Sequence, residues 1–212
     1  MTRSDATMVD AVAVYAHRVR ILVTGTSSGI GRATAALLIH DGHTVVATTR
    51  MPGTAPEGSV ELVGDLRDRS MLGRILEAGP FDALVSNAGI TNFCALEDMT
   101  DAELEAVFET NLLVPLRLAR LVLPGMRAER RGSLLFVSSQ SAYLPTPFVA
   151  AYSASKAGLE IAVESLAGEV RPWGIRTTLV LPGATSTSMA DKAIRDVPVD
   201  SPYRSAALAT GE

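Results

Sequence analysis

The sequence has 212 residues, 47% of them hydrophobic and 20% charged, with a formal net charge of −4. A chain of this size can bury one core but is too small for two comfortable domains, so we expect a single α/β domain. The mild negative charge indicates no nucleic-acid partner, because such a surface needs clustered Lys and Arg. No apolar run reaches about 18 residues, so no membrane span is expected.

The single cysteine, Cys94, excludes an internal disulfide framework and fits a reducing compartment such as the cytoplasm. Residues 1–18 lack the basic start and long apolar centre of a signal peptide. We expect them to form an extension of uncertain order and residues 19–212 to form the domain. The three histidines show no metal-ligand spacing, so no metal site is expected.

The first elements form a βαβ unit around a glycine-rich turn. Residues 19–24 and 43–49 are β-branched and apolar, as in buried strands, and residues 32–41 have a helical apolar face. In the turn at 25–31, three glycines would let the backbone approach a pyrophosphate, and the helix N-terminus would offer N–H donors. The spacing G-x-x-x-G-x-G differs from the G-x-G-x-x-G fingerprint, and alone it fits a plain tight turn equally well. Its place between a strand and a helix favours a dinucleotide.

The end of the second strand indicates which dinucleotide. An acidic side chain there would accept a hydrogen bond from a ribose 2′-hydroxyl, whereas an arginine would pair with a 2′-phosphate. The chain has Thr49-Arg50 at this point. We therefore expect NADP(H), with NAD(H) as the alternative; an Arg50 that is merely solvated would carry no preference.

Strands and helices continue to alternate. A third strand is expected at 60–63, a helix at 67–79 and a fourth strand at 81–86. Asp65 follows the third strand, at the edge where it could contact an adenine. Asn87-Ala88-Gly89 follows the fourth, where small residues would let a flat ring lie against the backbone, although the tripeptide alone is equally a turn.

A long helix is expected from 101 to about 130, with Asn111 at its middle. Asn is a mediocre helix former, so an Asn111 that faces a site would kink the helix and bind a water, whereas one that faces solvent would have no role. A fifth strand is expected at 132–138. Ser139 stands just past its carboxyl end, where open α/β sheets place their ligands.

The next helix, at 152–170, begins with Tyr152 and Lys156, which project from one face at about 3.6 residues per turn. A Lys ammonium beside a Tyr would lower a phenol pKa that starts at about 10, as proton exchange with a carbonyl near neutral pH requires. Alone, such a pair is more often an ordinary helix start with a surface lysine.

The remaining sequence predicts a sixth strand at 175–181, ended by Pro182-Gly183. A helical flap is expected at 185–196, followed by a tail of little order.

Together these motifs resemble the short-chain dehydrogenase/reductase family over roughly residues 18–187. The resemblance is to its compact branch, with a Thr-Gly-x-x-x-Gly-Ile-Gly turn and a Tyr-x-x-x-Lys pair. It implies a single doubly wound Rossmann-type domain with a parallel sheet flanked by helices. Relatives usually continue into another helix and a seventh strand, which we expect this chain to lack.

The resemblance also implies site roles. Tyr152 would be the general acid/base, Lys156 would bind the nicotinamide ribose and lower the Tyr152 pKa, Ser139 would bind the substrate oxygen, and Asn111 would position a water. The cofactor would be bound by Gly25, Ser27, Ser28, Gly29, Ile30, Gly31, Arg50, Asp65, Leu66, Asn87, Ala88, Gly89, Tyr152, Lys156, Pro182, Gly183, Thr185 and Thr187.

The expected activity is therefore that of an NADP(H)-dependent ketone or aldehyde reductase, or equivalently an alcohol dehydrogenase. The alternative is a non-catalytic dinucleotide-binding subunit for redox sensing or scaffolding, although such proteins tend to lose the Tyr or the Lys. Family members are mostly dimers and tetramers, so a homo-oligomer is expected. An apolar carbonyl or alcohol substrate is favoured by mostly apolar candidate wall residues, which ordinary loop packing explains equally well: Ile90, Phe93, Cys94, Leu96, Tyr143, Leu144, Phe148 and Met189.

Overall fold

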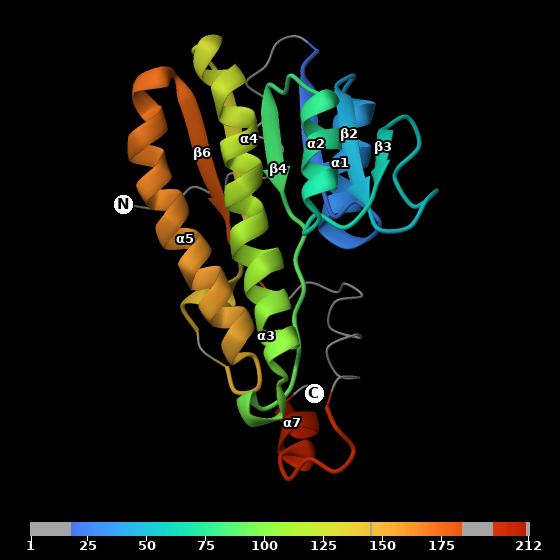
Figure 1. Cartoon of the computed structure of the whole chain (residues 1–212), viewed down its shortest axis with the longest axis vertical. Coiled ribbons are helices and arrows are strands. Elements are labelled where there is room, and N and C mark those ends of the chain that lie inside the picture. Colours follow the sequence, from blue (N-terminus) through green and yellow to red (C-terminus); the bar gives the residue numbers. More distant parts are fainter. Residues whose placement is uncertain (1–17, 145, 184–196, 211–212) are drawn as a thin grey trace.

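The computed structural model describes residues 18–144, 146–183 and 197–210 and contains one sheet of six parallel strands (Figure 1). Its order is β3-β2-β1-β4-β5-β6. The chain order therefore reverses direction between β1 and β4, which is the switch point where such sheets bind ligands. The strands are β1 Arg20–Thr24, β2 Thr44–Thr49, β3 Val60–Val63, β4 Ala83–Ser86, β5 Gly132–Val137 and β6 Ile175–Val180.

Helices cover both faces of this sheet. In Figure 1, α2, α4 and α5 lie in front of the strands and α1 lies behind them. The longer helices are α1 Gly29–His40, α2 Arg69–Glu77, α3 Asp101–Phe108, α4 Val114–Ala128, α5 Ala150–Val170 and α7 Arg204–Thr210. Short 3₁₀ turns are η1 Leu96–Asp98, η3 Gln140–Ala142 and η4 Arg171–Trp173.

The core has two parts because successive strand side chains point to opposite faces. Leu22 of β1 packs with Ile75 of α2 and Leu118 of α4 on one face. Its neighbours Ile21 and Val23 pack on the other face, where α1 lies. The doubly wound single domain with a parallel sheet is confirmed, and no seventh strand occurs among the described residues. Within that same part of the chain, no helix is long and apolar enough to cross a bilayer.

The predicted helix at 101–130 is present as a continuous helical run from residue 101 to residue 128, in which a π-helical turn, η2 Glu109–Leu113, joins α3 to α4. The expectation that the tail has little order was wrong. The tail holds the helix α7, and its Ala207 is fully buried. Tertiary contacts hold this short segment, since Ser201 donates to Asp98 at 2.6 Å and Tyr203 donates to Glu97 at 2.6 Å. The predicted flap at 185–196 lies outside the described residues.

Candidate active site

The glycine turn after β1 is held by the end of β4. The Thr24 hydroxyl accepts hydrogen bonds from the backbone N–H groups of Asn87 and Ala88, both at 3.0 Å. The Asn87 amide donates in return to the carbonyl oxygens of Thr24, at 2.9 Å, and Gly25, at 3.2 Å. The two segments that the sequence predicted for cofactor binding are therefore locked together.

The turn has no room for larger residues. A Cβ on Gly31 would lie 2.3 Å from the Asn87 amide nitrogen and 2.4 Å from the Gly25 carbonyl oxygen. Gly25 and Gly29 have φ values of 70° and 56°, which favour glycine. Helix α1 begins at Gly29 with no acidic residue in its first turn, and Ser27, Ser28 and Gly29 are exposed. This cradle of backbone N–H groups fits the pyrophosphate of a dinucleotide.

The ends of β2 and β3 carry the residues predicted to contact the adenosine. Arg50 is exposed just past β2. Asp65 accepts hydrogen bonds from the Arg67 guanidinium, at 2.7 to 3.1 Å, and from the Arg67 backbone N–H at 2.9 Å. These hydrogen bonds lower the Asp65 pKa, and the charge of Arg50 acts in the same direction. Leu66 is buried. The Asp65 carboxylate thus already has a cationic partner.

Sequence reasoning missed Glu61, which shapes the loop after β2. Its carboxylate accepts hydrogen bonds from the N–H groups of Gly53, Thr54 and Ala55, at 2.8 to 3.1 Å, and from the Thr49 hydroxyl at 2.9 Å. These hydrogen bonds lower the Glu61 pKa. Nothing in the linear pattern signals this role, because it depends on a loop folding back onto a neighbouring strand.

Asn111 lies in the π turn and is fully buried. Its amide nitrogen donates to the Ile90 carbonyl at 2.8 Å and to the Ser155 hydroxyl at 3.0 Å, and its amide oxygen accepts from the Ile90 N–H at 2.9 Å. Ser155 in turn donates to the Tyr152 carbonyl at 2.7 Å. Asn111 therefore ties the segment after β4 to α5, and both of its N–H donors are used. Only the second lone pair of its oxygen remains for the predicted water.

Tyr152, Lys156 and Ser139 lie together at the carboxyl end of β5. The Lys156 ammonium donates to the Val137 carbonyl at 2.8 Å and lies 5.9 Å from the Tyr152 ring centroid. A Cβ on Gly89 would lie 3.6 Å from this ammonium, so the end of β4 borders the same space. The Ser139 hydroxyl accepts from the Ser141 N–H at 3.2 Å.

The protonation of these groups differs from the expectation. Burial raises the pKa of Tyr152, and hydrogen bonding with Ser139 only partly opposes it. Burial also lowers the pKa of Lys156 to about 8, while the charge of Glu160 acts in the opposite direction. The predicted lowering of the Tyr152 pKa is therefore wrong for this structure, because desolvation of the phenolate dominates.

The structure gives fewer contacts for the remaining predicted residues. The Pro182 carbonyl accepts from the Gln140 N–H at 3.3 Å, so the end of β6 lies beside η3, with Gly183 next to it and exposed. Of the proposed wall, Phe93 and Phe148 pack together in a tilted arrangement with ring centroids 5.8 Å apart, and Cys94 is buried. Leu96, Tyr143 and Leu144 are more than half exposed. Thr185, Thr187 and Met189 lie outside the described residues.

Comparison with known proteins gives relatives for this arrangement. Residues 19–198 match the short chain dehydrogenase family. The 3-ketodihydrosphingosine reductase of Bacteroides thetaiotaomicron is 37% identical over 176 residues, which are 81% of this chain and 65% of the relative. A 3-oxoacyl-(acyl-carrier-protein) reductase of Vibrio harveyi is 36% identical, over 82% of this chain and 76% of its own length. The chain thus spans about two thirds of the first of these curated relatives and about three quarters of the second.

Solved structures of similar fold support the same family. A short-chain dehydrogenase from Streptomyces avermitilis superposes with a TM-score of 0.76 at 36% identity, covering 82% of this chain and 68% of that one. A metagenomic short-chain oxidoreductase in complex with NADP gives a TM-score of 0.73 at 33% identity, covering 79% and 83%. This chain is a member of the short-chain dehydrogenase family of oxidoreductases.

Proposed function

We propose that this protein transfers a hydride between NADP(H) and a carbonyl or secondary alcohol, with Tyr152 as general acid/base. The observation that carries the proposal is the convergence of Tyr152, Ser139 and Lys156 beside a glycine cradle at one edge of the sheet. Both curated relatives are named as reductases of keto or oxo compounds, which supports this chemistry.

Each side chain has a task that its surroundings suit. The dinucleotide, when bound, supplies the hydride. Because burial raises the Tyr152 pKa, its phenol is protonated at neutral pH and can donate to a carbonyl oxygen. Ser139 offers a second hydroxyl to the same oxygen, and such a donor is worth about 3 kcal/mol. The charge of Lys156 would stabilise the phenolate that remains.

The test is to follow nicotinamide absorbance with NADPH and a panel of ketones and aldehydes. We expect Tyr152→Phe to lower kcat by about 10²- to 10⁴-fold while NADPH still binds. The matched control is Tyr203→Phe, since that hydroxyl donates to Glu97, which has no role in the proposed proton transfer. Unchanged turnover in Tyr152→Phe would refute the proposal. NADPH binding without turnover in the wild type would instead favour the non-catalytic subunit.

We also propose a preference for NADP(H) over NAD(H). The exposed residue just past β2 is Arg50, where an NAD(H) site would have a carboxylate for the ribose 2′-hydroxyl, and the loop that follows is held by Glu61. The metagenomic short-chain oxidoreductase in complex with NADP is in keeping with this preference. Arg50→Ala should weaken NADPH binding about tenfold and leave NADH binding unchanged, because a charge-assisted contact to the phosphate is lost. Arg176→Ala, at an exposed position of β6, is the control, and equal losses for both dinucleotides would contradict the preference.

The substrate is proposed to be an apolar carbonyl compound, since the packed rings of Phe93 and Phe148 and the buried Cys94 offer no charged group to a ligand.

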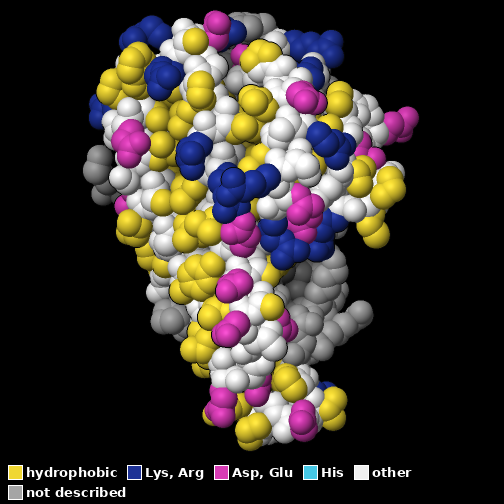
Figure 2. Space-filling view, viewed as in Figure 1, with side chains coloured by type: hydrophobic (Ala, Val, Ile, Leu, Met, Phe, Trp, Pro, Cys, Tyr) yellow, Lys and Arg dark blue, Asp and Glu magenta, His cyan; other side chains and the backbone are white. Residues whose placement is uncertain are grey.

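Homo-oligomerisation is proposed on the outer face of α4 and α5. Figure 2 shows hydrophobic side chains gathered over these helices, and Ile161 is 69% exposed. Sedimentation should give a multiple of the chain mass that falls in Ile161→Glu; a monomeric wild type would refute the oligomer.

A further inference from the structure

Helix α5 buries two charged side chains one turn apart, and the proposed chemistry uses only the first. Lys156 is 4% exposed and Glu160 is 2% exposed. Residues four apart lie on one helix face, so the two groups follow one another along the side that packs on the sheet. Lys and Glu are almost never fully buried unless they are paired or satisfied, so both positions call for a physical explanation.

Both side chains contact the same three-residue stretch at the end of β5. Lys156 donates to the Val137 carbonyl at 2.8 Å, and the next residue, Ser138, donates its hydroxyl to one Glu160 oxygen at 2.5 Å. The Ser138 N–H is fixed separately on the Val180 carbonyl of β6 at 2.8 Å. Ser139, the proposed substrate-binding hydroxyl, follows directly. Glu160 thus joins α5 to the strand end that carries the site.

The second carboxylate oxygen of Glu160 is buried and has no hydrogen-bond partner among the described residues. Its negative charge is therefore only half satisfied by local contacts. In a buried environment such a charge acts strongly on its neighbours, because screening by solvent is weak.

Among the described residues, Glu160 is the opposite charge that acts on Lys156. On α5 the titratable neighbours are Tyr152 and Glu160, and η2 contributes the uncharged Asn111. From β5 come the Val137 carbonyl and the Ser138 hydroxyl. Burial brings the Lys156 pKa down to about 8, and Glu160 works against this fall. Near neutral pH the charge of Lys156 is thus sensitive to any change at Glu160.

We propose that Glu160 is a positioning residue of the active site, which keeps Lys156 protonated near neutral pH and ties α5 to the strand end that carries Ser139. Its kinetic consequence rests on the proposed function. The charge on Lys156 does not, because it can be measured without cofactor or substrate.

The composition of the chain makes this measurement direct. The sequence contains two lysines, Lys156 and Lys192, so protein labelled with ¹³C at lysine Cε gives two titrating signals, which Lys192→Arg assigns. Glu160→Gln keeps the side-chain size and an oxygen for Ser138 but removes the charge. We expect the Lys156 midpoint to fall by about one pH unit, since an opposite charge is lost in a buried site. Glu164→Gln, the same change at an exposed position of α5, should leave it unmoved.

Two more variants separate charge from packing, and one covers a failure of Glu160→Gln to fold. Glu160→Asp retains the carboxylate and should keep the Lys156 midpoint within a few tenths of a pH unit of the wild type. Ser138→Ala removes the hydrogen bond and should lower kcat without moving the midpoint. An unchanged midpoint in Glu160→Gln, or a fall of a full unit in Glu160→Asp, would overturn the proposal.

Kinetics connect the charge to turnover. In Glu160→Gln the alkaline limb of the kcat profile should move toward lower pH with the Lys156 midpoint, so that turnover above it falls about tenfold while KM changes little. If the wild type reduces no carbonyl compound, the proposed function fails and the titration result stands. If the wild type is active and Glu160→Gln titrates like it, the inference about Glu160 alone fails.

Discussion

The two edges of the sheet differ in how their charged side chains are placed. At the carboxyl edge, Lys156 and Glu160 are buried, and one Glu160 oxygen has no partner among the described residues. At the amino edge, charges are paired near the surface: Asp82 accepts from the Arg20 N–H at 2.8 Å and lies 3.4 Å from Arg131, which is half exposed. Burying charge costs free energy that surface pairs avoid, so the carboxyl edge carries a cost that folding alone does not require.

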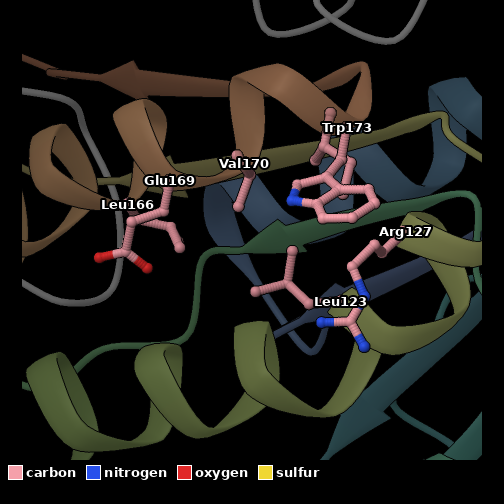
Figure 3. Close-up of a pocket in the computed structure, with 7 residues that line it drawn as sticks. Leu123, Arg127, Leu166, Glu169, Val170 and Trp173 are labelled. Atoms are coloured by element: carbon pink, nitrogen blue, oxygen red, sulfur yellow. The ribbon is translucent and has the colours of Figure 1, made fainter.

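A hollow also distinguishes the amino edge (Figure 3). It has a volume of about 220 Å³ and is lined by the last turns of α4 and α5, including Leu123, Leu166 and Val170. Trp173 lies there with the guanidinium groups of Arg127 and Arg130 at 5.8 and 5.7 Å from its ring. Its only charged lining groups, Arg127 and Glu169, are exposed. This hollow thus lies at the amino edge, whereas Tyr152 and Lys156, whose pKa values are shifted by burial, lie at the carboxyl edge.

The largest expected effect comes from adding one methyl group at the carboxyl edge. In Gly31→Ala the new Cβ would meet the Asn87 amide at 2.3 Å and the Gly25 carbonyl at 2.4 Å, so the turn must open. We expect NADPH binding, measured by fluorescence or calorimetry, to weaken at least about 100-fold, because the backbone N–H groups lose their alignment.

The matched control lies toward the amino edge, near the other end of α5. A Cβ on Gly168 would meet nothing within 4 Å, so Gly168→Ala should bind NADPH normally. Its free energy of unfolding should rise by about 0.5–1 kcal/mol, because alanine favours the helix over glycine. Equal binding by the two variants would remove the distinction between the edges.

Part of this arrangement is predictable from local patterns. The glycine turn between a strand and a helix, the Tyr152–Lys156 spacing and the position of Ser139 after an apolar run all depend on residues close in sequence. Such signals also predicted the βαβ alternation, and the β3 bounds are reproduced without change. Helix starts differ by a few residues, as α1 begins at Gly29 inside the predicted turn.

The rest depends on contacts between distant segments. Glu160 looks like any helix glutamate until the fold places Ser138 against it, and Ser155 gains its role only when Asn111 reaches it across 44 positions. The π turn at η2 accompanies these buried Asn111 contacts, and α7 is held by contacts to η1. The Tyr152 pKa was predicted in the wrong direction because burial is a property of the whole fold.

A smaller effect concerns stability against pH. Lys156 has a folded-state pKa of about 8, below its ordinary 10.5, so the folded state binds this proton less tightly than the unfolded state. The unfolding free energy should therefore rise as pH increases through 8, at up to about 1.4 kcal/mol per pH unit from this group. Urea unfolding of the wild type and Lys156→Met between pH 7.5 and about 9.5 should show an added rise of roughly 1–2 kcal/mol in the wild type alone. Parallel curves would show that folding does not lower the Lys156 pKa.

The smallest effect is expected at the amino edge, where the charged groups lie near the surface. Arg127→Gln removes one of the two guanidinium groups beside Trp173 and should lower the unfolding free energy by about 0.5–1 kcal/mol, the worth of an exposed cation–π contact. Trp173 is the sole tryptophan, so its fluorescence reports unfolding in this variant, with Arg120→Gln at an exposed position of α4 as the control. Turnover should stay within twofold, because the change leaves every charge near Lys156 in place. A tenfold loss of kcat with binding intact would mean that α5 transmits the state of the hollow to Lys156 and Glu160, and the two edges would then have to be treated as one coupled unit.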